Sequence, residues 1–170
     1  MEEKNYKEKL KNITTFIFDV DGVFTNTQVF VDNDGDLFRS MNMKDGFALK
    51  TAIAKGYTIC IITGGGNVGV RKRFENLGVT DIFMLRHEKL ETFLEYQKTK
   101  GLRTEQILYM GDDIPDIPPM QHSGLATCPQ DAVPEVKAAA HYISHRDGGQ
   151  GAVRDVIEQV LKVRGDWFSF

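Results

Sequence analysis

The sequence predicts an α/β fold built on a doubly wound, mostly parallel sheet. Two observations predict it: short apolar, β-branched runs end at polar residues or glycine, and apolar residues at helical spacing lie between these runs. Strands that alternate with helices of this size form βαβ units, which build a Rossmann-like parallel sheet with helices on both faces. A chain of 170 residues fits one such domain, so we expect a single domain over 1–170.

Five strands are predicted along the chain. Three are strongly apolar and β-branched, and they lie at 13–18, 57–62 and 107–110. Two weaker candidates lie at 81–85 and 140–143. The strong runs are followed by Asp19, by Thr63 and by Gly111-Asp112. Short apolar runs with such boundaries are typical of buried parallel strands.

Four helices are predicted from apolar residues at helical spacing, around 47–53, 70–77, 90–94 and 153–161. Asp45 is expected to cap the first, and Gly78 and Gly101 to end the second and third. The segment 27–41 breaks the alternation, because it carries Asn33-Asp34-Gly35 between two β-rich arms. This pattern predicts a β-hairpin inserted between the first strand and the first helix.

Composition excludes several classes of protein. The 21 basic and 24 acidic residues give a net charge of −3, with no strongly basic cluster, so no nucleic-acid partner is expected. No apolar run is long enough to span a membrane, and the charged first twelve residues show no secretory signal. Cys60 and Cys128 are too few for a disulfide framework. We therefore expect a cytoplasmic protein.

Polar residues follow three predicted strands at the ends where open α/β sheets bind ligands. Asp19 and Asp21 follow the first strand, Thr63 and a run of glycines follow the second, and Asp112 follows the third. Lys89 lies at the start of a helix before the third strand. Alone, each has an ordinary explanation as a solvated turn, a loop, a helix cap or a surface lysine. Together, each near a strand end, they predict an active site.

The residue types suit phosphoryl transfer. Two carboxylates two positions apart point to the same side of an extended segment, so Asp19 is the candidate nucleophile and Asp21 the candidate acid and base. Mg²⁺ prefers carboxylate and phosphate oxygens, and Asp112 is the candidate second metal carboxylate. Thr63 and Lys89 offer donors to phosphoryl oxygens, and the glycines from Gly64 onward let backbone N–H groups approach an anion.

These residues resemble the motifs of the haloacid dehalogenase superfamily of phosphatases. The match comprises DVDGVFT at 19–25, Thr63, Lys89 and GDDIPD at 111–116. The resemblance implies that Asp19 is the nucleophile and Asp21 the acid and base. It also implies that Asp19, the backbone carbonyl of Asp21 and Asp112 hold Mg²⁺. Asp116 would then orient Lys89 or the water shell of the metal, and Asp113 is a further supporting candidate.

The spacing of these motifs indicates which members of the superfamily the chain resembles. The segments between Asp21, Thr63 and Lys89 are filled by predicted elements and hold no separate cap domain, so the chain is similar to capless members. An open site of this kind needs another subunit to exclude water. Over nearly its whole length the chain resembles the 3-deoxy-D-manno-octulosonate 8-phosphate (KDO-8-phosphate) phosphatase family, through the NDGD hairpin, MKDGFALK and GGQGAVRDV at 148–156.

That resemblance implies further properties. It implies hydrolysis of a sugar-acid phosphate in lipopolysaccharide synthesis, and a homotetramer assembled through the hairpins. In the family, the C-terminal segment of one subunit reaches toward a neighbouring active site. The Asp-Trp-Phe-Ser-Phe segment at 166–170 fits such a role, unless these aromatic side chains pack on their own subunit.

Two positions depart from the family pattern. Gly65 stands where the family usually has arginine, and Gln150 stands where the late glycine motif usually has one. Arg86, His87 and Arg73 are candidates to replace the lost cations. The alternative substrate is a nine-carbon 2-keto-sugar-acid 9-phosphate, on which related capless enzymes act.

Two other functions share part of this residue pattern. A signalling receiver domain also gathers acidic residues, Thr and Lys on such a sheet, but its acceptor Asp lies on the third strand, whereas here it follows the first. A non-catalytic partner of a sugar-acid cytidylyltransferase is the second alternative. The intact set of Asp19, Asp21, Thr63, Lys89 and Asp112 argues against it.

Overall fold

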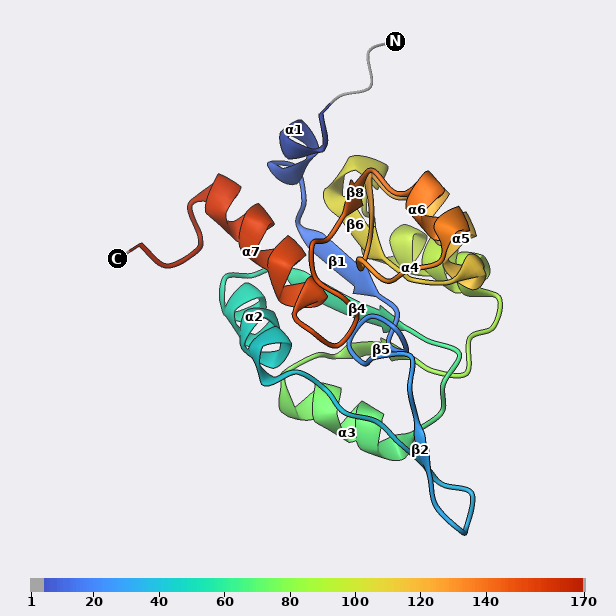
Figure 1. Cartoon of the computed structure of the whole chain (residues 1–170). Helices are drawn as coiled ribbons and strands as arrows, with labels where there is room; N and C mark the ends of the chain where they lie inside the picture. The colour runs from blue at the N-terminus through green and yellow to red at the C-terminus, as the bar shows by residue number, and fades with distance from the viewer. Residues whose placement is uncertain (1–4, 170) are drawn as a thin grey trace.

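A computed structural model describes residues 5–169 and has one parallel sheet at its centre (Figure 1). All neighbouring strands in it are parallel. In spatial order the strands are β5 (Asp81–Phe83), β4 (Thr58–Ile62), β1 (Thr15–Phe18), β6 (Ile107–Met110), β7 (Leu125–Cys128) and β8 (Tyr142–Ile143). The predicted α/β fold is confirmed. The weaker strands are shorter than expected, and β7 was not predicted.

Helices cover both faces of the sheet (Figure 1). On one face, Phe16 and Phe18 share a core with α2 (Met43–Ala54), α3 (Val68–Asn76) and α7 (Ala152–Arg164). On the other face, Ile17 and Cys60 share a core with α4 (Lys89–Lys100), α5 (Ile117–His122) and α6 (Pro134–Ala139). The short α1 (Tyr6–Leu10) precedes β1. Successive strand residues point to opposite faces, so both cores are apolar. The strands β1, β6 and β7 are buried throughout, whereas the edge strands β5 and β8 are partly exposed.

The start of α2 differs from the prediction. The helix begins after Asn42, whose side-chain oxygen accepts a hydrogen bond from the backbone N–H of Lys44 at 2.8 Å. Asp45 is therefore not the cap but the third residue of the helix. Its buried carboxylate accepts a hydrogen bond from the backbone N–H of Arg154 at 2.8 Å, in the first turn of α7. Asp45 thus joins the N-terminal ends of two neighbouring helices.

The predicted hairpin is present and projects from the body of the molecule (Figure 1). Its arms are β2 (Phe30–Val31) and β3 (Leu37–Phe38), paired antiparallel with Phe30 opposite Phe38. Phe30 is 72% exposed and Phe38 56%. Val29, Val31 and Leu37 are exposed as well. The hairpin therefore presents an apolar surface, which is uncommon for a segment that stays in water.

The C-terminal segment returns to its own chain. After Gly165, the hydroxyl of Tyr57 donates a hydrogen bond to Asp166 at 2.6 Å. The rings of Trp167 and Phe168 lie 6.4 and 5.8 Å from the ring of Phe47 on α2. These aromatic side chains pack on their own subunit, and Phe170 lies outside the described residues. Within residues 5–169, no helix has the length and apolar character needed to cross a membrane.

Candidate active site

The loop after β1 places Asp19 at the floor of a cavity. The backbone N–H of Asp19 donates to the carbonyl of Met110 at 3.0 Å, which extends the pairing of β1 with β6. The chain then turns tightly, and the carbonyl of Val20 accepts three backbone N–H groups. Gly22 has a φ of +81°, and a Cβ there would collide with the carboxylate of Asp112. Glycine therefore allows the loop after β1 to approach the loop after β6.

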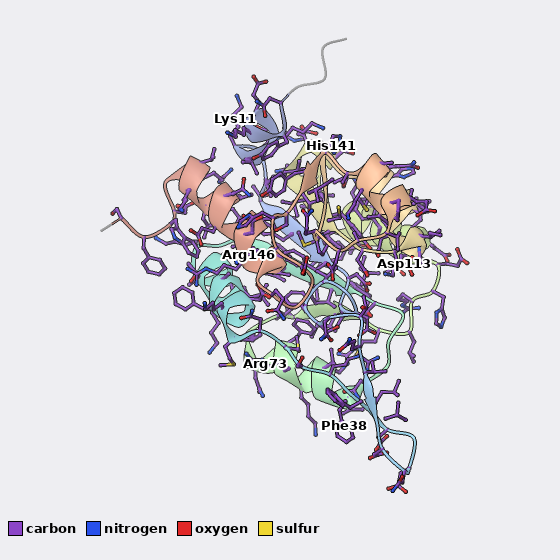
Figure 2. The ribbon with its side chains drawn as sticks, viewed as in Figure 1. Lys11, Phe38, Arg73, Asp113, His141 and Arg146 are labelled. Carbon is purple, nitrogen blue, oxygen red and sulfur yellow. The ribbon has the colours of Figure 1, made fainter. Side chains whose placement is uncertain are left out.

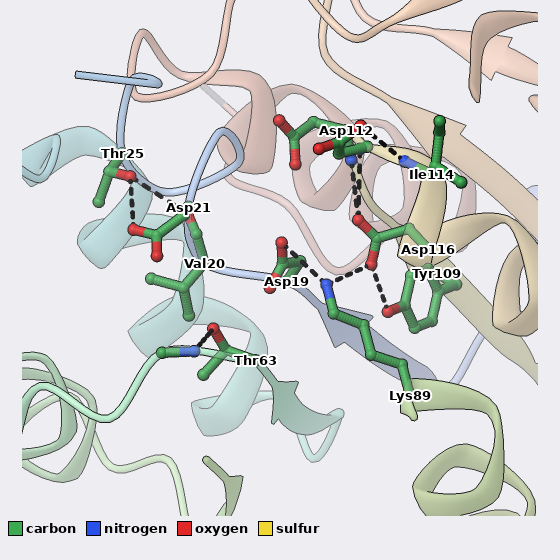
Figure 3. A network of polar contacts seen from close by, with 12 residues as sticks. Asp19, Val20, Asp21, Thr25, Thr63, Lys89, Tyr109, Asp112, Ile114 and Asp116 are labelled. Atoms are coloured by element: carbon green, nitrogen blue, oxygen red, sulfur yellow. Dashed lines mark hydrogen bonds and ion pairs between the residues drawn. The ribbon is translucent and has the colours of Figure 1, made fainter. Parts of the chain in front are cut away.

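Lys89 links two buried carboxylates (Figure 3). Its Nζ lies 3.0 Å from Asp19 Oδ2 and 2.7 Å from Asp116 Oδ1. Asp116 Oδ1 also accepts a hydrogen bond from the hydroxyl of Tyr109 at 2.8 Å. Its Oδ2 accepts the backbone N–H of Asp112 at 3.2 Å. Burial disfavours the ammonium, but the charges of Asp19 and Asp116 outweigh it and raise the pKa of Lys89.

Three carboxylates converge at this point. Asp19, Asp112 and Asp116 each offer an oxygen, and these oxygens lie within 4.8 Å of one another. Burial, and then the charge of Asp116, raises the pKa of Asp19 to about 7. Burial, followed by the charges of Asp19 and Asp116, raises the pKa of Asp112 to about 8. Lys89 alone does not balance three negative charges, so the cluster is short of positive charge.

This cluster fits a magnesium ion. Asp19 Oδ1 is buried and has no hydrogen-bond partner among the described residues, although Oδ2 faces Lys89. A hard divalent cation prefers such carboxylate oxygens and would relieve their mutual repulsion. Asp116, which was expected to play a supporting role, belongs to the cluster, whereas the carboxylate of Asp21 does not. A role for the backbone carbonyl of Asp21 stays a prediction.

Asp21 has a partner that the sequence motifs do not indicate. The Nε and Nη2 atoms of Arg39 lie 2.5 and 3.1 Å from the two carboxylate oxygens of Asp21. The hydroxyl of Thr25 also donates to Asp21, at 3.4 Å. Arg39 follows β3 directly, so the hairpin supplies this contact. In the sequence, the only indication of this contact is a cationic residue at the end of the second arm of the predicted hairpin.

The loop after β4 forms the opposite wall. Thr63 is buried, and its Oγ1 accepts the backbone N–H of Gly65 at 3.2 Å. Gly64 and Gly65 line the cavity without side chains. A facing loop is attached by two hydrogen bonds, from Leu85 N–H to the carbonyl of Gly65 at 3.3 Å and from Arg86 N–H to that of Thr63 at 2.9 Å.

These loops enclose a cavity of about 460 Å³ at the carboxyl ends of β1, β4 and β6. It brings together ten predicted site residues: Asp19, Asp21, Thr63, Gly64, Arg86, His87, Lys89, Asp112, Asp113 and Asp116. Asp113 accepts the backbone N–H of Ile114 at 2.8 Å. Arg73 does not line this cavity. It lies on α3, well apart from Asp113 (Figure 2), with Nη2 3.5 Å from the sulfur of Met43.

The glycine motif at 148–151 packs against the loop after β1. A Cβ on Gly148 would collide with the carbonyl of Gly22, and the backbone N–H of Gly149 donates to the carbonyl of Val23 at 2.9 Å. Gln150 does not line the catalytic cavity. It lies in a separate hollow with Lys44 and Arg154.

Comparisons with known proteins agree with this geometry. Residues 78–157 match the model of a haloacid dehalogenase-like hydrolase family. The chain is 32% identical over 157 residues to the 3-deoxy-D-manno-octulosonate 8-phosphate phosphatase of Salmonella typhi, covering 92% of this chain and 84% of that protein.

Solved structures of phosphatases with this name are also similar to the chain. The phosphatase of that name from Yersinia pestis has a TM-score of 0.93 at 31% identity, covering 96% of this chain and 88% of that one. The phosphatase from Moraxella catarrhalis, in complex with a magnesium ion, a phosphate ion and KDO, has a TM-score of 0.91 at 29% identity, covering 96% and 94%. This chain therefore belongs to the 3-deoxy-D-manno-octulosonate 8-phosphate phosphatase family of haloacid dehalogenase-like hydrolases.

Proposed function

We propose that this chain is a magnesium-dependent phosphatase that hydrolyses 3-deoxy-D-manno-octulosonate 8-phosphate to KDO and phosphate. The observation that carries this proposal is Asp19. Its carboxylate lies at the floor of the cavity with one oxygen fixed by Lys89 and the other without a hydrogen-bond partner in the described chain. Lys89 therefore orients this carboxylate at the cavity floor, where it can attack a phosphoryl group bound in the cavity. The magnesium-bound and KDO-bound relative from Moraxella catarrhalis supports the same substrate class.

The reaction proceeds in two steps. Asp19 attacks phosphorus to form an acyl-phosphate, the ester P–O bond breaks, and Asp21 donates a proton to the departing sugar oxygen. Water then attacks the phosphoryl group, Asp21 accepts its proton, and phosphate leaves with Asp19 restored. Thr63 and the N–H groups of the following glycines donate to the phosphoryl oxygens. Lys89 keeps Asp19 oriented.

Magnesium would be held by Asp19 and Asp112, with Asp116 in the same cluster and the carbonyl of Asp21 as a further oxygen. When bound, the ion supplies positive charge that offsets the charge of the phosphoryl group. Lys89 and Tyr109 hold Asp116 in place, so the chain keeps its carboxylates in position before the ion binds.

Phosphate release in the presence of Mg²⁺ tests the function. KDO-8-phosphate and a nine-carbon 2-keto-sugar-acid 9-phosphate are compared side by side. Preference for the eight-carbon substrate supports the proposal, and preference for the nine-carbon substrate supports the alternative, in which Gly65 and Gln150 mark a change of substrate. A folded protein that binds Mg²⁺ but releases phosphate from neither ester would favour the non-catalytic partner of a sugar-acid cytidylyltransferase.

The nucleophile is tested by Asp19→Asn. This variant should lose turnover by at least about 10⁴-fold and stay folded, because the amide is a poor nucleophile of nearly the same shape. Asp81→Asn, at the opposite end of the sheet, is the matched control and should retain activity. Near-wild-type turnover by Asp19→Asn would rule out the assignment.

We also propose a cytoplasmic homotetramer assembled through the hairpin. The exposed apolar side chains of Phe30 and Phe38 support this assembly, since such a surface is normally covered. Light scattering at micromolar concentration should give a tetramer, and Phe30→Ser with Phe38→Ser should give a smaller species. A monomeric wild-type chain would refute the assembly without affecting the chemistry assigned to Asp19.

A further inference from the structure

The cationic side chains of the catalytic cavity are not equivalent. Within residues 5–169, three of them line it: Lys89, Arg39 and Arg86. Lys89 is paired with Asp19 and Asp116, and Arg39 is paired with both oxygens of Asp21. The guanidinium of Arg86 forms no ion pair or hydrogen bond with any described residue. Arg86 is thus the lining cation that is available to a ligand without the loss of an existing ion pair.

The backbone holds Arg86 at the cavity in an unusual way. The preceding residue, Leu85, has a φ of +58°, the only left-handed non-glycine residue between 5 and 169. This conformation is unfavourable for a leucine and persists only where the surroundings enforce it. Here the two hydrogen bonds to the carbonyls of Thr63 and Gly65 enforce it. The strained turn therefore directs the chain so that residue 86 lies beside the Thr63 loop.

The space next to Arg86 is open. Gly64 and Gly65 line the facing wall and bring no side chain into it. A Cβ on Gly65 would already lie 3.4 Å from Asp21 Oδ2, and one on Gly64 would lie 3.4 Å from His87 Nδ1. Any side chain at these two positions would contact Asp21 or His87, so the two glycines keep this wall of the cavity free of side chains next to the loop of Arg86 and His87.

The proposed substrate class carries two anionic groups. Its phosphate is placed at Asp19, where Lys89 and a magnesium ion offset the charge. Its carboxylate lies at the other end of the sugar and needs a separate cation, because a buried or partly buried carboxylate without one is unfavourable. Arg39 would have to release Asp21 to serve, which would leave that carboxylate unpaired.

We propose that Arg86 binds the carboxylate of the sugar acid and thereby selects acidic sugar phosphates over neutral ones. This inference rests on the proposed function. A guanidinium suits the task because it donates two parallel hydrogen bonds to one carboxylate, which fixes orientation as well as charge. Arg86 is accordingly a binding residue, and the phosphoryl chemistry at Asp19 does not require it.

The experiment compares two substrates and three variants. The substrates are KDO-8-phosphate and the same sugar phosphate with its carboxylate reduced to an alcohol. The variants are Arg86→Ala, Arg86→Lys and Arg103→Ala. Arg103 serves as the matched control, because it is an exposed arginine paired with Glu105 before β6, at the other end of the sheet. Steady-state phosphate release gives kcat and KM for each combination.

Arg86→Ala should raise KM for KDO-8-phosphate roughly 10- to 100-fold with little change in kcat, as expected for loss of a charged hydrogen-bonded contact. Arg86→Lys should recover part of the loss. The wild type should use the reduced substrate poorly, and Arg86→Ala should not make it worse. The melting temperature should change little in any variant, because Arg86 forms no ion pair or hydrogen bond with the described residues and the pair of Arg103 with Glu105 is exposed.

Each other outcome overturns one proposal or both. An unchanged KM in Arg86→Ala, an equal loss on both substrates, or a wild type that uses both substrates equally well would overturn the role of Arg86 and leave the phosphatase standing. A wild type that prefers the nine-carbon acid overturns the eight-carbon substrate assignment. A wild type that hydrolyses no sugar-acid phosphate overturns the proposed function, and the role of Arg86 with it.

Discussion

The guanidinium of Arg39 contacts both carboxylate oxygens of Asp21, so a residue of the hairpin fixes a residue of the loop after β1. The Arg39 side chain is 10% exposed, which means that it lies largely inside the protein although the hairpin itself projects outward. A displacement of the hairpin would therefore move Asp21. We infer that the position of the hairpin affects proton transfer by Asp21.

This coupling predicts the kinetics of variants at both positions. Asp21→Asn should lower kcat by about 10²- to 10⁴-fold, the range for loss of a general acid. Arg39→Ala should lower kcat by roughly 10-fold, because Asp21 remains but is no longer oriented. The double variant should be no slower than Asp21→Asn alone, since Arg39 acts through Asp21.

The test is a double-mutant cycle on kcat for phosphate release. Arg39→Lys is the control, and it should recover part of the activity because it keeps the charge without the two-point contact. Independent, multiplicative losses in the double variant would show that Arg39 acts directly on the substrate or on folding instead.

Magnesium should stabilise the fold through the converging carboxylates. Because Asp19, Asp112 and Asp116 converge only in the folded chain, Mg²⁺ should bind that state alone, and at 100 times its Kd it should add about 2.7 kcal/mol to the free energy of unfolding. Asp112→Asn should lose most of this gain and most of the activity. Thermal unfolding with Mg²⁺ and with a chelator measures the difference.

Asp113→Asn is the matched control for the magnesium experiment. Asp113 is adjacent in sequence, but its carboxylate caps Ile114 and lies outside the cluster. Asp113→Asn should keep the rise in melting temperature that Mg²⁺ produces in the wild type. A full magnesium-induced shift in Asp112→Asn would contradict the proposed metal site.

The buried carboxyl group of Asp45 should make the free energy of unfolding depend on pH. Burial raises its pKa from the ordinary value of 3.8 to about 6. The folded chain then holds this proton more tightly than the unfolded chain. The stabilisation from Asp45 is fully present below pH 3.8 and is lost as the pH rises through 6. The shift corresponds to about 3 kcal/mol, as an order of magnitude.

The measurement is the free energy of unfolding in urea at several pH values between 4 and 7, with saturating Mg²⁺. Asp45→Asn keeps an oxygen that accepts the N–H of Arg154 but does not ionise. The wild type should therefore lose stability relative to this variant as the pH rises from 4 to 7. Parallel curves for the two proteins would exclude a titrating Asp45.

Gly148 occupies a position where the structure leaves no room for a side chain. Gly148→Ala would drive its Cβ into the carbonyl of Gly22, which must shift along with the loop that carries Asp19 and Asp21. Overpacking of this kind costs about 1–3 kcal/mol, and activity should fall as well. Gly56→Ala is the control, because a Cβ on Gly56 faces open space, and its only cost is the positive φ of that residue. It should lose roughly 1 kcal/mol of stability and no activity.

The main part of the fold could be predicted because β1, β4 and β6 are short, continuous apolar runs. β7 was missed because Leu125–Cys128 contains alanine and threonine, and α5 because prolines interrupt its pattern. The capping error at α2 arose because Asn42 and Asp45 are both good caps three positions apart, and only the contact of Asp45 with α7 distinguishes them.

The candidate site was predictable for a geometric reason. The carboxyl ends of neighbouring parallel strands meet at one edge, so Asp19, Thr63 and Asp112 had to lie close together. Arg39 and Tyr109 could not be found in the same way. Arg39 reaches the site from the hairpin, whose angle no local pattern specifies, and Tyr109 looks like an ordinary strand residue in an apolar run.

The packing of the C-terminal segment makes the protein its own optical reporter. Trp167 is the only tryptophan among the 170 residues, so emission excited at 295 nm comes from this segment alone. Its ring lies 6.4 Å from that of Phe47 and 5.5 Å from the guanidinium of Arg154. Release of the segment would expose the indole to water and shift its emission to longer wavelength. Fluorescence can therefore follow docking of the C-terminus during assembly or turnover without any added label.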